Sequence, residues 1–119
     1  MTIDRTDLLL DLINDAASDA TSYVRGMSPE AFVADTKTRR AVSMCLVVIG
    51  ENVSRLAKRQ PEFIAAHPET PWGDAIGLRN RIAHGYEDLD FGVIWRTATV
   101  FLPRLLASLP ASKPFDPDA

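Results

Sequence analysis

The sequence lacks the features that mark several large classes of protein. It has one cysteine, Cys45, so no disulfide can form within the chain. No apolar run approaches the roughly 20 residues needed to cross a bilayer, and the N-terminus shows no signal-peptide pattern. We therefore expect a cytoplasmic protein without membrane contact, in which Cys45 is a buried and inert thiol.

Positive charge and histidine are also scarce. The chain has 13 Lys and Arg against 16 Asp and Glu, a formal net charge of −3, so broad attraction to nucleic acid is not expected and any RNA site must be a local basic one. The two histidines, His67 and His84, are far apart in sequence, and no spacing of His and Cys is typical of zinc. We expect no metal site and no cofactor.

What the sequence does contain is helical periodicity throughout its length. At 119 residues it is one domain, with no strand-like alternation. Helices are predicted at about 4–24, 28–34, 35–59, 71–84 and 90–109, with a short turn or helix at 62–69. This pattern of four main helices and one or two short ones indicates an all-α, compact helical bundle over residues 1–109. Three prolines make residues 110–119 a loose C-terminal tail.

Three of these helices carry more specific predictions. In the first helix, three- and four-residue steps predict one buried face, made by Leu9, Leu12, Ala16, Ala20 and Tyr23. The third, at 35–59, is apolar nearly all round between 41 and 49, which predicts a central helix. In the last helix, the proline at 103 predicts a kink.

The densest group of chemically useful side chains lies at 78–86, where the predicted motif helix ends. Its spacing is Arg79-x4-His84-x-Tyr86, with Asn80 beside the arginine. Arg79 can hold a phosphate by two parallel hydrogen bonds, and His84 can transfer protons near neutral pH. Asn80 could hold the imidazole or contact substrate. The alternative is a structural role, in which the Arg and the His only stabilise the C-terminus of the helix.

Arginine with histidine and no metal fits cleavage of RNA by its own 2′-hydroxyl, a nucleophile that DNA lacks. Such cleavage needs an acid and a base, and one chain offers a single good histidine. A symmetric dimer with two facing copies of His84 would supply both.

Four further features bear on this hypothesis. Gly50 within an apolar helix predicts a close approach of another helix, and Glu51 after it may lie against an arginine, at a subunit interface or in solvent. Arg81 should point about 200° away from Arg79 and cannot line the same narrow site. A stripe of acidic residues at four-residue spacing is either a solvated face or a contact for a basic partner: Asp7, Asp11, Asp15 and Asp19.

The segment from Arg79 to Tyr86 resembles the signature of the HepT-like branch of the HEPN superfamily. Other landmarks of that branch occur in the same order: Ile49-Gly50-Glu51, Pro71-Trp72, Asp88-Leu89-Asp90 and Val93-Ile94-Trp95. The resemblance covers roughly residues 4–109, which is most of the chain.

The resemblance implies a dimeric helical bundle with two motifs across a shared cleft, acting as a metal-independent RNase toxin. Arg79 and His84 would be catalytic and Asn80 supporting, and a small nucleotidyltransferase antitoxin would add AMP to Tyr86. An alternative from the same superfamily is a non-catalytic nucleotide- or substrate-binding partner of a minimal nucleotidyltransferase. A helical interaction protein without either property is a third.

Overall fold

The computed structural model describes residues 5–83 and 90–112, and every regular element in these two ranges is a helix. The first part contains α1 (Thr6–Tyr23), α2 (Pro29–Ala34), α3 (Thr36–Arg59), α4 (Pro61–Ala66) and α5 (Trp72–Ala83). The second contains α6 (Phe91–Arg96), the π-helical segment η2 (Thr97–Phe101) and α7 (Leu102–Ser108). The prediction of an all-α fold is confirmed.

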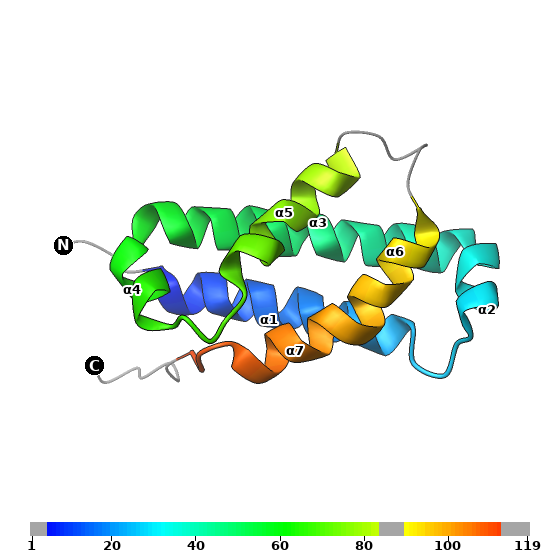
Figure 1. The fold of residues 1–119 in the computed structure, drawn as a ribbon, viewed down its shortest axis with the longest axis horizontal. Coiled ribbons are helices and arrows are strands. Elements are labelled where there is room, and N and C mark those ends of the chain that lie inside the picture. Colours follow the sequence, from blue (N-terminus) through cyan, green and yellow to red (C-terminus); the bar gives the residue numbers. More distant parts are fainter. Residues whose placement is uncertain (1–4, 84–89, 113–119) are drawn as a thin grey trace.

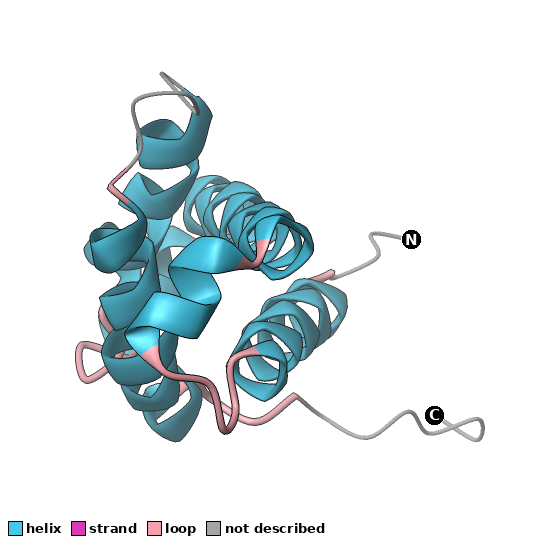
Figure 2. Cartoon of the chain, turned by 90° about the vertical axis from the view of Figure 1, so that its right-hand side faces the viewer, coloured by secondary structure: helices cyan, strands magenta, loops and turns pink. Residues whose placement is uncertain are grey.

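The long helices α1 and α3 lie side by side and form the base of the bundle (Figure 1). α5 packs obliquely on α3, while the run from α6 through η2 to α7 descends across the bundle and ends against α1. Figure 2, which looks along α1 and α3, shows the oblique helices gathered on one side of this pair. α3 is therefore the element that both α1 and the motif helix α5 contact.

The core follows one face of α3. Val42, Leu46, Ile49, Val53 and Leu56 recur at four- and three-residue steps, and all are buried. Burial of each such side chain stabilises the fold by roughly 1.5–3 kcal/mol. This stripe fixes how α3 is rotated, and so decides which of its polar residues face outward beside α5.

The predicted central position of α3 is confirmed, because it contacts α1, α2, α4, α5 and α6, whereas the predicted burial of Cys45 and of two residues on α1 was wrong. Met44 lies in the apolar stretch of α3 but is 62% exposed, and Cys45 is only partly buried, because the neighbouring helices leave one side of α3 open. On α1 the predicted Leu9, Ala16 and Ala20 are buried together with Ile13, but the predicted Leu12 and Tyr23 are exposed. Three- and four-residue steps define a helical face only to within about one residue, so Leu12 falls just outside the contact.

Short polar side chains begin the helices as the sequence predicts. Ser28 accepts a hydrogen bond from the Ala31 amide at 3.1 Å and begins α2. Asp35 begins α3 and accepts hydrogen bonds from the Thr38 amide at 3.0 Å and from the Thr38 hydroxyl at 2.8 Å. These two bonds from Thr38 lower the pKa of the Asp35 carboxyl. Gly26 follows α1 with a φ of 78°, a left-handed conformation that glycine adopts without strain.

The last predicted helix is continuous but changes type before Pro103. The amide of Leu102 donates to the Thr97 carbonyl five residues earlier, which is the π-helical pattern of η2. Proline has no amide hydrogen and its ring crowds the carbonyl four residues before it, and a π-helical turn is one way to accommodate such a break. The perturbation predicted at Pro103 thus takes the form of η2.

The acidic stripe of α1 and the start of the C-terminal tail meet. The Ser112 hydroxyl donates to Oδ1 of Asp11 at 2.6 Å, while Asp15 and Asp19 are exposed. Residues 113–119 lie outside the described part, so the prediction of a loose tail is untested there. Across the described residues, no helix is long and apolar enough to span a membrane.

Candidate active site

The motif helix α5 is held against α3 by a contact at Gly50. A methyl group placed on Gly50 would lie 2.7 Å from the backbone nitrogen of Arg79, 2.9 Å from its Cβ and 3.2 Å from the Ala75 carbonyl oxygen. Only a glycine allows this approach, so the predicted close helix contact is confirmed. Gly50 therefore positions the backbone of Arg79 itself.

The residue after Gly50 holds the side chain of Arg79. Glu51 forms ion pairs with two arginines: one carboxylate oxygen lies 2.7 Å from Nε of Arg79, and the other lies 3.3 Å from Nη2 of Arg55. Of the alternatives for Glu51, the structure supports contact with an arginine. Arg79 uses Nε for this pair, its two Nη groups contact no partner within residues 5–83 and 90–112, and 51% of its side chain is exposed.

These residues line a polar groove between α3 and α5 with a volume of about 330 Å³. Its lining residues are Gly50, Glu51, Ser54, Arg55, Lys58, Ile76, Arg79 and Asn80. Among the described residues that line it, three cationic side chains face one carboxylate, a local charge of +2 in a chain whose formal net charge is −3. The groove is a local basic site of the kind that RNA binding would require in an acidic protein.

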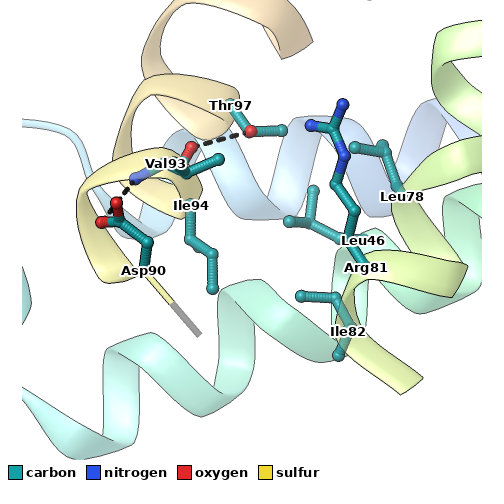
Figure 3. A pocket seen from close by; sticks show the side chains of 8 residues that line it. All are labelled: Leu46, Leu78, Arg81, Ile82, Asp90, Val93, Ile94 and Thr97. Atoms are coloured by element: carbon teal, nitrogen blue, oxygen red, sulfur yellow. Dashed lines mark hydrogen bonds between the residues drawn. The ribbon is translucent and has the colours of Figure 1, made fainter. Parts of the chain in front are cut away.

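Arg81 faces a different part of the molecule, as its position on the helix predicts. It lies at the rim of an apolar pocket between α5 and α6, opposite Thr97, with Leu46 at the floor (Figure 3). A neighbouring hollow brings Arg81 together with Asp74 and Phe101. Arg79 and Arg81 thus serve two separate surfaces, and only Arg79 shares one with Asn80.

A second, apolar groove follows the same side of α3 toward the end of α5. It has a volume of about 300 Å³ and is lined by Arg40, Ser43, Met44, Val47 and Ile82. Met44 is exposed there, and Ile82 stands two positions before His84 in the chain. The side of α3 that carries Glu51 therefore continues into an open apolar surface.

The structure brings together two of the four predicted site residues, Arg79 and Asn80. His84 and Tyr86 lie outside the described residues, so their predicted roles are untested by the geometry. The other histidine, His67, pairs with Glu69 at 3.2 Å and packs on Phe63, away from the residues that line the polar groove. No cluster of three potential metal ligands occurs among residues 5–83 and 90–112.

Sequence reasoning missed Arg55 and Lys58. The signal was present, because they follow Glu51 by four and seven residues and so share its side of the helix. Near the end of a helix such cations are usually assigned to the helix dipole, which is why they did not stand out.

Comparison with known proteins places this geometry in a family. The family described as "Ribonuclease HepT-like" matches residues 13–111. A protein named "Probable ribonuclease HepT" from Thermococcus cleftensis is 31% identical over 96 residues, covering 81% of this chain and 84% of the relative. A protein of Caldanaerobacter subterraneus subsp. tengcongensis that carries an RNase name is 37% identical over 82 residues, covering 69% of this chain and 70% of the relative.

No solved structure gives a significant match. The family match spans most of the chain and includes both the α3 residues around Gly50 and the whole of the motif from Arg79 to Tyr86. The chain belongs to the HepT-like ribonuclease family.

Proposed function

We propose that this protein is an endoribonuclease that cleaves RNA without a metal ion, and that it acts as the toxin of a toxin–antitoxin pair. The observation that carries the proposal is Arg79, an exposed guanidinium anchored through Nε in a groove of positive charge. Neither Nη group has a partner among the described residues, and a guanidinium can hold a phosphodiester by two parallel hydrogen bonds. Family membership supports the ribonuclease part of this proposal.

The proposed reaction is an internal transesterification. The ribose 2′-oxygen attacks the adjacent phosphorus as a general base removes its proton, and the bond from phosphorus to the 5′-oxygen breaks as a general acid protonates that oxygen. The products are a 2′,3′-cyclic phosphate and a 5′-hydroxyl. Arg79 stabilises the charge that builds on the phosphoryl oxygens, His84 transfers protons, and Asn80 orients the imidazole or the substrate.

The two proton transfers require two copies of His84, so we propose a two-fold dimer. The apolar groove around Met44 supports a location for it, because it is open and ends at Ile82, close to His84 in sequence. Met44→Glu should give a monomer in light scattering and lose RNA cleavage. Val100→Glu is the control, because Val100 is also an exposed apolar residue and lies outside this groove. A monomeric wild-type protein with full activity would refute the composite site.

The catalytic assignment is tested by replacing Arg79 or His84 with alanine. Each change should lower RNA cleavage by about 10²–10⁴-fold and abolish growth arrest on expression, with an unchanged helical circular dichroism spectrum. Arg81→Ala is the matched control, since it removes the same charge from the same helix but faces the pocket of Figure 3. Undiminished cleavage by His84→Ala, or wild-type activity that disappears in a chelator, would sink the proposal.

We further propose that a small nucleotidyltransferase neutralises this protein by attaching AMP to Tyr86. The modification adds bulk and a negatively charged phosphodiester two residues from His84, where it would compete with the RNA phosphate for Arg79. Coexpression with a nucleotidyltransferase encoded beside it should add AMP masses that fragmentation assigns to Tyr86. Tyr86→Phe should stay unmodified and toxic, while Tyr23→Phe should be modified like wild type. Equal silencing of Tyr86→Phe would overturn this control mechanism.

A further inference from the structure

The cations of α3 beside Glu51 have no part in the reaction proposed above, yet they share its groove. Arg55 and Arg79 contact the two oxygens of one carboxylate, so their guanidinium groups are neighbours. Lys58 lies one turn further along α3 and lines the same groove. Glu51 balances one of these three charges, and it is the acidic residue among the described residues that line the groove, so the groove wall keeps an excess of positive charge there.

We infer that Arg55 and Lys58 form a backbone-binding subsite that holds the RNA phosphate next to the one at Arg79. The inference rests on the proposed function and names where the substrate strand runs, namely along the groove between α3 and α5 from the motif toward the C-terminal end of α3. Phosphate contacts of this kind position a strand without reading its sequence. The subsite would therefore bind a single strand of RNA or DNA whatever its sequence. Only RNA has the 2′-hydroxyl that cleavage requires.

The subsite also accounts for how an acidic protein can hold an anionic substrate. Beyond about 8–10 Å the overall negative charge is screened at physiological salt, so the strand senses mainly the groups of the groove. Arg59 provides an internal comparison, because it carries the same charge in the same final turn of α3 and does not line the groove. If these cations served only to stabilise the helix dipole, Arg59 and Lys58 would have the same effect on RNA binding.

The test measures binding of a short fluorescein-labelled single-stranded RNA by anisotropy as a function of salt, in a His84→Ala background that prevents cleavage. Each phosphate contact contributes about 0.7 to the slope of log affinity against log salt for single strands, so Arg55→Ala/Lys58→Ala should flatten it by about 1.4. Between about 50 and 200 mM salt, the RNA affinity of the His84→Ala parent should then fall roughly sevenfold more than that of the double variant in the same background. Arg59→Ala and the charge-preserving Arg55→Lys/Lys58→Arg should keep the original slope.

A slope lowered by about 0.7 in Arg59→Ala, the amount expected for one phosphate contact, would mean diffuse attraction and overturn the subsite, as would an unchanged slope in the double variant. Unchanged RNA binding together with lost binding of the coexpressed nucleotidyltransferase would assign the groove to that partner instead. Both replaced side chains are exposed, and a thermal melt checks that the fold is retained. If the wild-type protein cleaves RNA but Arg55→Ala/Lys58→Ala leaves the salt slope unchanged, only the subsite is refuted. If the double variant flattens the slope but the wild-type protein cleaves no RNA, only the proposed function is refuted.

Discussion

The contact between Gly50 and Arg79 gives the most direct test of how the fold positions the site. In Gly50→Ala the new methyl group would lie 2.7 Å from the Arg79 backbone nitrogen, and ordinary contact begins at 3.4 Å. α5 must therefore move away from α3 by about 0.7 Å, the difference between the two distances. The atoms in the way belong to the backbone and Cβ, so no side-chain rotation can relieve the clash.

The cost has two opposing parts. Overpacking of this kind typically destabilises by about 1–3 kcal/mol, and replacing a helical glycine by alanine returns about 1 kcal/mol of helix propensity. Because backbone atoms are hit, we expect a net loss near the upper end, about 1–2 kcal/mol, which lowers Tm by roughly 3–10 °C in a protein of this size. The rate of RNA cleavage should fall by up to about 100-fold in protein that is still folded, since a displacement near 1 Å disrupts catalytic geometry.

Gly77→Ala is the matched control on the facing helix, because a methyl group there meets nothing within 4 Å. It should raise stability by up to about 1 kcal/mol through helix propensity and leave cleavage unchanged. Thermal melts and cleavage rates of the two variants are compared side by side. If Gly50→Ala were as stable as Gly77→Ala and fully active, the close approach would not position Arg79 and the reasoning would be refuted.

Two further predictions follow from individual side chains. Glu51→Gln should change the free energy of unfolding by less than about 1 kcal/mol, because exposed ion pairs contribute little. It should lower kcat without raising KM, since Arg79 loses its anchor while the groove loses a negative charge; a raised KM with unchanged kcat would contradict this positioning role. Burial, followed by the nearby charge of Asp19, raises the pKa of the Cys45 thiol, so alkylation by iodoacetamide at pH 8 should be slower than for a free thiol. Asp19→Asn should speed it modestly, and no change would show that burial alone controls the thiol.

Local signals determined the helices and their starts. Ser28 and Asp35 accept amide hydrogen bonds where the sequence places helix starts, because an N-cap depends only on residues within one turn. The close helix contact predicted at Gly50 is confirmed. It was predictable because glycine lowers helix propensity, a cost that tertiary packing must offset. The motif from Arg79 to Tyr86, together with the other landmarks in the same order, likewise identified the family without any structure.

The tertiary structure decided how these parts meet. Glu51 and Arg79 are 28 positions apart in the sequence, and no local pattern pairs them; they meet because the buried stripe of α3 sets its rotation and Gly50 sets its distance from α5. The same packing recruited Arg55 into the groove and left Met44 exposed. Periodicity shows that a helix has a buried face but not which neighbour covers it, so the sequence determined the candidate catalytic groups and only the packing of α5 on α3 built the basic groove around them.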